Sequence, residues 1–448
     1  MTENKMGVMD VRQLLIQMSL PIMISMLVQA LYNIVDSMFV ARVSTEALTA
    51  VSLCYPVQMI LVAVACGTGV GVNALLSRYL GQQDPQMASQ TALHGIFLGL
   101  MNGLVFALLG FFGARSFLAL FTHQANILEM GVVYMRICTV FSFGVFVQIT
   151  YERIMQATGN TFYNMVIQGV GALVNIILDP IFIFGWLGLP AMGVAGAAIA
   201  TVAGQIVAMI LGIWITQKKV KEITIHVRVF RLSAKLLGNL YRIAIPAILM
   251  QSITSFMTVL MNMILVPFGE LAVSCFSIYY KLQQFVFMAV SGLTNALIPI
   301  VSYNYGARKY HRIREATRYS LLFSCALMGA GTLIFQLFNR ELLLLFEATQ
   351  EMLAIGSPAL SIISWSFILA GISMVLGSVF QAVDHGGQSL MITLFRQMIL
   401  LLPLVYLLAF TFGLAISWWA FVITEGAMAV LSLYLYRRIC RQSLQIPA

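Results

Sequence analysis

The sequence predicts an all-α polytopic membrane protein with twelve transmembrane helices in two six-helix lobes. Three observations predict this class. Of the 448 residues 60% are apolar and 9% are charged, whereas soluble domains carry about 25% charged residues. Twelve apolar stretches are each long enough to cross a bilayer, which takes about 20 residues. The two halves of the chain also align with each other. This composition excludes a soluble enzyme, a disordered chain and a disulfide scaffold, and the long apolar stretches exclude an outer-membrane barrel.

The expected spans fall into two sets of six, separated by the longest polar connection. Those of the first half lie at 14–40, 51–77, 92–112, 131–151, 163–184 and 194–216. Those of the second half lie at 240–266, 275–301, 318–338, 356–380, 389–410 and 414–436. The predicted organisation is therefore an N-lobe (1–216), a cytoplasmic linker (217–239) and a C-lobe (240–448).

The distribution of basic residues predicts the orientation. The net charge is +9, and most lysines and arginines lie in the N-terminal segment, the linker, the other loops on that side and the C-terminus. The positive-inside rule then places both termini in the cytoplasm, and it explains the basic charge without nucleic acid as a partner. A full-length span follows the polar N-terminus directly, so we expect no cleavable signal peptide. The six cysteines show no CxxC spacing and are interpreted as packing residues.

The second half repeats the first at a fixed offset of 225 residues. Among the matching landmarks, Pro21 aligns with Pro246, Gly67 with Gly292, and Ser77 with Ser302; the others are Gly81 with Gly306, Gly131 with Gly356, and Gln156-Ala157 with Gln381-Ala382. An even number of spans per repeat makes both lobes enter the membrane in the same direction, which predicts a pseudo-two-fold axis along the membrane normal. Carriers with alternating access often have this arrangement; the alternative is a duplicated structural bundle.

Polar residues in the expected spans of the N-lobe form stripes. The first span carries Gln29, Tyr32, Asn33 and Asp36 at positions i, i+3, i+4 and i+7, which lie on one helix face. The fifth span carries Asn175 and Asp179, and the sixth carries Thr201 and Gln205, in both cases at i and i+4. Such groups cannot face lipid, so we expect them to converge inside the lobe.

Asp36 and Asp179 are two of three acidic residues well inside expected spans; the third is Glu425. A carboxylate at mid-membrane costs roughly 2.5–3.5 kcal/mol on insertion scales, so each is a functional candidate. Two carboxylates among amide and hydroxyl oxygens suit Na⁺ or a shared proton. The alternative is a structural hydrogen-bond network between helices.

The C-lobe shows a different pattern. Its first span has a neutral stripe of Gln251, Ser255, Thr258 and Asn262, and Met261 stands where Asp36 stands in the N-lobe. Glu425, in the last span, is interpreted either as a contact for cationic cargo or as a paired structural acid. Arg396 is expected to snorkel toward the cytoplasmic surface. No phosphate-binding loop, metal-ligand cluster or catalytic triad is recognisable, and we predict that the protein is not an enzyme.

Several stretches of the chain resemble the multidrug and toxic compound extrusion (MATE) family. They are Pro21 with YNIVDSMFVARVSTEAL around Asp36, QATGN at 156–160, NIILDPIFIFG at 175–185 and GVAGAAIAT at 193–201. The resemblance covers essentially the whole chain. It implies the MATE fold and export of organic cationic or amphipathic drugs in exchange for H⁺ or Na⁺, with no other cofactor.

The resemblance also implies roles for individual residues. Asp36, Tyr32, Asn175, Asp179 and Thr201 would form a cation site, and Pro21 would be the bend of the first helix. The substrate cavity would include Gln29, Asn33, Gln205 and Glu425 together with the neutral C-lobe stripe. The seventh and tenth spans lack the acids of the NorM-like branch, which places the chain nearer the DinF-like branch. The implied location is the inner (plasma) membrane of a prokaryote, with small-molecule drugs and the bilayer as partners and no obligatory protein partner.

Three rival functions remain at this stage. A lipid-linked oligosaccharide flippase of the same superfamily would be expected to carry more cations inside the membrane and often more than twelve spans. A membrane-embedded enzyme would need a catalytic constellation. A channel would conduct cations in the absence of drug.

Overall fold

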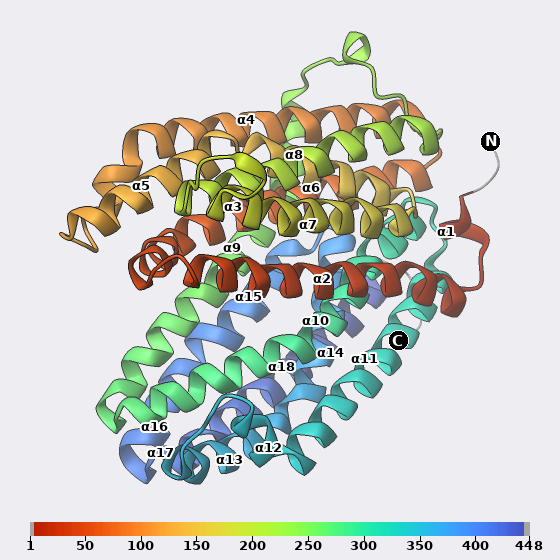
Figure 1. The fold of residues 1–448 in the computed structure, drawn as a ribbon. Coiled ribbons are helices and arrows are strands. Elements are labelled where there is room, and N and C mark those ends of the chain that lie inside the picture. The colour runs from red at the N-terminus through yellow and green to blue at the C-terminus, as the bar shows by residue number, and fades with distance from the viewer. Residues whose placement is uncertain (1–3, 443–448) are drawn as a thin grey trace. The chain divides into compact units, whose positions relative to one another are not determined.

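The computed structural model describes residues 4–442, and all regular secondary structure in that range is helical (Figure 1). The elements of the first half are α1 (Lys5–Val8), α2 (Val11–Ala41), α3 (Thr45–Gly81), α4 (Pro85–Leu118), α5 (Ala125–Val140), α6 (Phe143–Ala157), α7 (Thr161–Phe184), η1 (Trp186–Gly188) and α8 (Val194–Lys219).

The second half repeats this order of long helices. Its elements are η2 (Val227–Val229), α9 (Ala234–Leu265), η3 (Val266–Phe268), α10 (Glu270–Gly306), α11 (Tyr310–Leu337), α12 (Asn339–Leu344), α13 (Gln350–Ser364), α14 (Ser366–Ala382), α15 (Gly386–Leu394), the π-helix η4 (Phe395–Ile399), α16 (Leu401–Phe412), α17 (Leu414–Ser417) and α18 (Trp419–Gln442).

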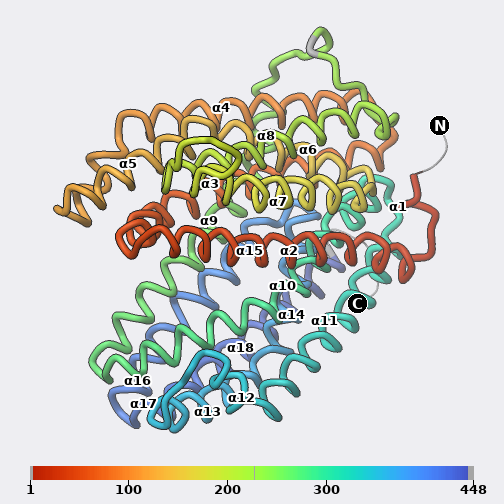
Figure 2. The backbone as a smooth tube through the Cα atoms, viewed as in Figure 1, coloured from red at the N-terminus to blue at the C-terminus, as the bar shows by residue number. Residues whose placement is uncertain are grey.

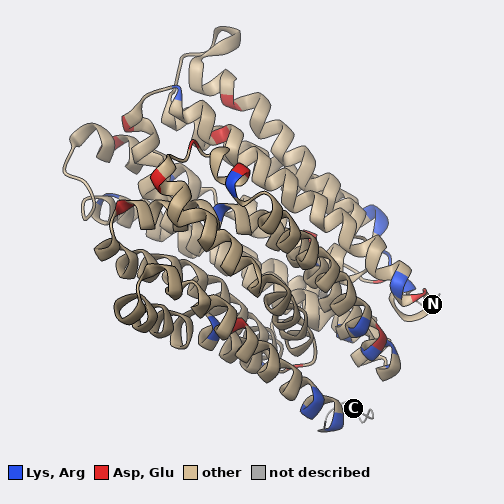
Figure 3. Ribbon diagram, turned by 90° about the horizontal axis from the view of Figure 1, so that it is seen from below, with Lys and Arg blue, Asp and Glu red and all other residues tan. Residues whose placement is uncertain are grey.

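Ten of these helical segments are long and apolar enough to cross a membrane, and two bent helix pairs bring the number to as many as twelve. The bent pairs are α5 with α6, at 43°, and α13 with α14, at 45°. The spans expected at 131–151 and 356–380 are therefore broken rather than continuous. Charged residues gather toward the ends of the helices and are sparse along their middles (Figure 3), as a bilayer requires.

The breaks have a local cause that sequence periodicity does not reveal. At the first break the amide of Ser142 donates to the carbonyl of Thr139, which tightens the turn, and the Ser142 hydroxyl donates to the Gly103 carbonyl on α4 (3.3 Å). A Cβ on Gly103 would lie 2.8 Å from the Cα of Phe143, so only glycine admits the second helix of the pair there. The second break, at Trp365, lies 225 residues beyond Val140.

The chain divides into two compact units, which we call the N-unit (Ile24–Ile248) and the C-unit (Met1–Met23 with Leu249–Ala448). These bounds differ from the expected lobes because each unit takes the first part of a helix that continues into the other. The start of α2 belongs to the C-unit, and the start of α9 belongs to the N-unit. Figure 2 traces both helices through the backbone.

The two exchanged helix segments make equivalent contacts. In the N-unit a Cβ on Gly67 would lie 2.7 Å from the backbone nitrogen of Ile248, and in the C-unit a Cβ on Gly292 would lie 3.0 Å from that of Met23. Both partners are related by the 225-residue offset. Other contacts repeat in the same way: Ser77 donates to the Ala157 carbonyl (3.2 Å) and Ser302 to that of Ala382 (3.1 Å). The duplication predicted from the sequence therefore appears as matching contacts in the two units.

The linker expected at 217–239 is held against α4 inside the N-unit. The Gln90 side chain donates to the Val229 carbonyl (2.6 Å) and accepts from the Arg231 amide (3.2 Å). The ring of Phe230 lies 5.0 Å from that of His94, and the amide of Ser233 donates to His94 Nε2 (3.0 Å). The linker thereby fixes the start of α9.

Candidate functional site

Small residues bring α7 and α8 together. Gly185, with φ +75°, ends α7 in the left-handed conformation that favours glycine. The chain then turns back, and α8 meets α7 closely: a Cβ on Gly196 would lie 2.5 Å from the Phe182 carbonyl carbon, and one on Gly204 would lie 2.6 Å from the Gly171 carbonyl oxygen. This close approach lets short polar side chains on the two helices reach each other.

The acid of α7 is fully buried at this contact. Asp179 is 0% exposed and Asn175 is 2% exposed. The Asn175 amide donates to Asp179 Oδ1 (3.5 Å) and to the hydroxyl of Thr201 on α8 (3.4 Å). The structure thus brings together three of the predicted site residues from two helices.

Asp36 on α2 completes the cluster. Its carboxyl group lies close to that of Asp179. Two neighbouring carboxyl groups repel each other when both are ionised, and a proton or a cation between them relieves that repulsion. Tyr32, one turn earlier on α2, lies near both acids. All five residues predicted for the cation site therefore lie in one cluster of the N-unit.

The cluster retains buried oxygens without a protein donor. They are Asp36 Oδ1, Asp179 Oδ2 and Asn175 Oδ1. Buried polar atoms are normally paired, so three unpartnered oxygens at one place leave acceptors that a cation or a proton would satisfy. Across residues 4–442 no group of three or more His, Cys, Asp or Glu side chains could hold a metal ion.

Other predicted residues of the N-lobe lie outside this cluster. Gln29 accepts a hydrogen bond from Gln168 on α7 (3.3 Å). Asn33 is exposed, and its carbonyl accepts from the Ser37 hydroxyl (2.8 Å). Gln205 is half-buried, with its Cβ beside Gly144 of α6. Pro21 lies within α2, which runs from Val11 to Ala41.

The sequence analysis did not predict a group of hydrogen-bonded polar side chains beside Asp36. The Gln58 amide on α3 donates to the hydroxyl of Tyr134 on α5 (3.1 Å), and Cys138 Sγ lies 4.0 Å from the same amide. Tyr134 and Cys138 both lie near Asp36. The signal available in the sequence was one glutamine in an otherwise apolar stretch of the second span.

The sequence analysis also did not identify a fourth acid inside a helix, Glu152. Glu152 lies one residue beyond the expected span 131–151, but α6 continues to Ala157 and buries this residue to 6% exposure. Its carboxylate accepts from Gln148 (3.0 Å). Beside it, Arg153 donates to Gln156 (2.9 Å), which also accepts from Asn73 (3.4 Å). The error came from ending the span where the charged residues begin.

The C-unit does not gather its predicted polar stripe into a cluster. Gln251 and Ser255 are exposed, and the Thr258 hydroxyl donates to the Thr254 carbonyl of its own helix (3.1 Å). Asn262 is half-buried with an unpartnered Oδ1.

Glu425 forms the C-unit's buried charge pair instead. Arg396 Nε lies 3.5 Å from Glu425 Oε1, and both side chains are about 15% exposed. The expectation that Arg396 snorkels is therefore wrong, because the π-helix Phe395–Ile399 adds a residue to this turn and Arg396 pairs with α18. The Tyr279 hydroxyl lies near Glu425. Of the two interpretations of Glu425, the structure shows the paired acid.

A multi-span helical membrane protein with a buried acid pair in one half is a class that contains many secondary transporters. Comparison with known proteins gives the family. A family model described as MatE matches residues 21–181 and 246–407, once in each half of the chain. The chain belongs to the MatE family.

Named relatives and solved structures agree with this membership. "Multidrug export protein MepA" of Staphylococcus aureus is 25% identical over 424 residues, which cover 94% of this chain and 92% of the relative. The protein of the same name from Staphylococcus haemolyticus is 24% identical over 420 residues, with coverage of 93% and 91%. These names confirm that the chain belongs with transporters rather than enzymes.

Two solved structures superimpose over almost the whole chain. A MATE in complex with MaL6 gives a TM-score of 0.91 at 26% identity, with 99% of both chains covered. A Pyrococcus furiosus transporter of the MOP superfamily, described as having a binding pocket of reversed polarity that suggests a different function, gives 0.91 at 25% identity with 100% and 99% coverage. The predicted fold is confirmed.

Proposed function

We propose that the protein is a secondary active antiporter that exports organic cationic or amphipathic drugs in exchange for H⁺ or Na⁺ by alternating access. The observation that carries this proposal is the Asp36–Asp179 pair of the N-unit, in which each acid has a buried, unpartnered oxygen. The names of the staphylococcal relatives support multidrug export. The absence of an acid on α9, where Met261 replaces Asp36, supports placement in the DinF-like branch.

The coupling follows from the hydrogen bonds of the pair. Uptake of H⁺ or Na⁺ from outside neutralises the two carboxylates, and Asn175 and Thr201 adjust to the new charge. This rearrangement within the N-unit weakens its hold on the drug, which leaves to the outside. The unit then returns loaded with the ion, which is released to the cytoplasm. The basic residues of the loops and linker support cytoplasmic termini in the inner membrane of a prokaryote.

The test is dye efflux from proteoliposomes under separately imposed pH and sodium gradients. One gradient should drive uphill efflux in the wild type, and Asp36→Asn should abolish it. Glu46→Gln, an exposed acid at the start of α3, is the matched control and should transport normally. Gradient-driven efflux by Asp36→Asn at the wild-type rate would overturn the proposal. Cation flux without dye would indicate a channel instead.

A further inference from the structure

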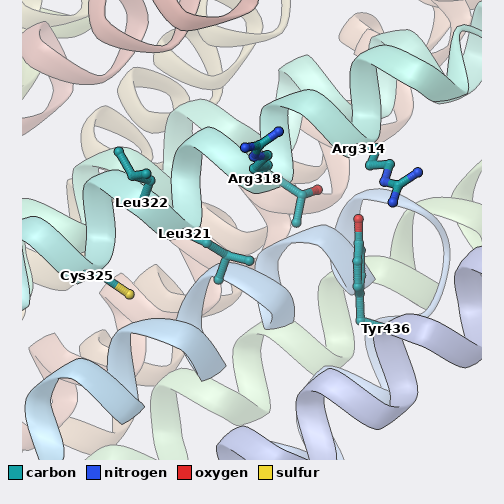
Figure 4. Close-up of a pocket in the computed structure, with 7 residues that line it drawn as sticks. Arg314, Arg318, Leu321, Leu322, Cys325 and Tyr436 are labelled. Atoms are coloured by element: carbon teal, nitrogen blue, oxygen red, sulfur yellow. The ribbon is translucent and has the colours of Figure 1, made fainter. Parts of the chain in front are cut away.

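A cavity of about 490 Å³ lies in the C-unit between α11 and α18, away from the charge pair and the polar stripe. Six residues of α11 and Tyr436 of α18 line it, and Figure 4 shows how they lie. The cavity takes no part in the exchange mechanism proposed above, so its chemistry requires a separate account.

The lining changes from charged to apolar along α11. Arg314 and Arg318 lie one turn apart on the same face, and Leu321, Leu322 and Cys325 continue along it. Cys325 lies eleven residues after Arg314, which is about 16 Å along a helix. In Figure 4 Arg314 and Cys325 lie at opposite ends of the α11 segment. A ligand that fills this cavity must therefore have one anionic end and one apolar end.

Both guanidinium groups are available to such a ligand. Arg314 and Arg318 are exposed, and neither forms an ion pair with a carboxylate in the part of the chain that the structure describes. Across the cavity the Tyr436 hydroxyl interacts with the Thr317 side chain, and in Figure 4 the tyrosine ring points toward α11. Two arginines with a nearby hydroxyl suit a phosphate group, because guanidinium donors match phosphate geometry.

The charged end of the cavity lies where the N-terminal segment is anchored. Arg312, in the first turn of α11, donates to the Met9 carbonyl (2.5 Å), and Lys309 donates to that of Gly7 (3.0 Å). In the proposed orientation this end is cytoplasmic. The cytoplasmic leaflet carries the anionic lipids and a negative surface potential.

We propose that this cavity binds an anionic phospholipid of the cytoplasmic leaflet. The phosphate lies between Arg314 and Arg318, and an acyl chain follows Leu321 and Leu322 toward Cys325. The choice of leaflet rests on the membrane orientation given in the proposed function. The match between the cavity and an anionic lipid does not depend on that orientation. A soluble phosphate would leave the apolar length of the cavity unoccupied, which is why the lipid is the better match.

The test is lipid binding to the purified full-length protein in detergent, followed by native mass spectrometry and thermal unfolding. Phosphatidylglycerol, phosphatidylcholine and the water-soluble glycerol phosphate are added separately. The variant Arg314→Gln/Arg318→Gln removes both guanidinium groups, and Arg314→Lys/Arg318→Lys keeps the charge as a check on folding. Arg437→Gln/Arg438→Gln, exposed at the end of α18 outside the cavity, is the matched control for the loss of two charges.

We expect phosphatidylglycerol to bind the wild type about thirtyfold better than phosphatidylcholine and to stabilise it more, since each of the two arginines contributes about fivefold for an anionic lipid. The double Gln variant should lose this preference, and the lysine and α18 variants should keep it. Equal binding by the double Gln variant, or equal stabilisation by glycerol phosphate, would overturn the proposal. No gradient or dye is used, so failure here is distinguishable from failure of the efflux proposal.

Discussion

The two halves of the chain carry acids on helices that do not correspond, and they balance the charge of these acids differently. In the N-unit Asp36 and Asp179 face each other, and neither forms an ion pair with a lysine or arginine of the described residues. In the C-unit Glu425 is paired with Arg396. An uncompensated acid pair requires a cation or proton from outside the protein, whereas a compensated pair is already neutral. In the proposed function, ion coupling therefore belongs to the first half, and the charge pair of the second half has a structural role.

The largest expected effect follows from removing one acid of the N-unit. Asp179→Asn leaves a single carboxylate that no longer shares a proton, so uphill dye efflux should fall to the level of protein-free liposomes. The measurement is efflux under an imposed gradient, with binding of the dye recorded in parallel. Retention of coupled efflux would mean that the acid pair is only a structural network.

The second effect concerns stability in the C-unit. Glu425→Gln leaves a buried arginine without its partner, which should cost about 3–5 kcal/mol. The double variant Arg396→Met/Glu425→Gln removes both charges and should recover most of that loss while keeping gradient-driven efflux. Thermal unfolding in detergent measures the stability of both variants, and the liposome assay measures gradient-driven efflux by the double variant. A double variant that is stable but no longer shows gradient-driven efflux would mean that the C-unit charge pair takes part in coupling. That result would contradict the difference in role between the two halves.

The third prediction tests the contacts that the halves share. Gly67→Ala and Gly292→Ala each place a methyl group against the backbone of a crossing helix, and each should destabilise the protein by about 1–3 kcal/mol. Gly113→Ala, on α4 with open space around it, should leave the stability unchanged or slightly raised. Unequal losses at Gly67 and Gly292 would show that the repeat symmetry of the contacts does not extend to their energies.

The smallest effect sharpens the account of the N-unit site. Thr201→Val keeps the shape of the side chain but removes the hydroxyl that accepts from Asn175 (3.4 Å). The expected cost is about 1 kcal/mol, seen as a several-fold weaker dependence of efflux on the driving ion. Thr49→Val, an exposed threonine of α3 that bonds only its own helix, is the control. If Thr201→Val changed the ion dependence of efflux no more than Thr49→Val does, Thr201 would have no role in the site.

The sequence was most informative where one physical constraint acts alone. Bilayer thickness sets the length of apolar stretches, so the number of spans was predictable. The i, i+4 spacing placed Asn175 and Asp179 on one face before any helix was located. The fixed offset of the repeat also predicted that Gly67 and Gly292 occupy equivalent positions.

Features that depend on tertiary contacts could not be predicted. The bend after Val140 depends on the neighbouring backbone, where Gly103 of α4 lies against Phe143. Glu152 lies in a helix that continues past the apolar stretch, and its carboxylate accepts a hydrogen bond from Gln148 there. The Arg396–Glu425 pair joins helices that are distant in sequence, and composition alone favoured a snorkelling arginine.

The most direct measurement is ion release on dye binding to the purified protein, in weakly buffered detergent, with pH and ²²Na⁺ recorded in the same titration. The account predicts that dye displaces one of the two ions from the wild type and from Arg396→Met/Glu425→Gln, and displaces neither from Asp36→Asn. Ion release by Asp36→Asn equal to that of the wild type would contradict it.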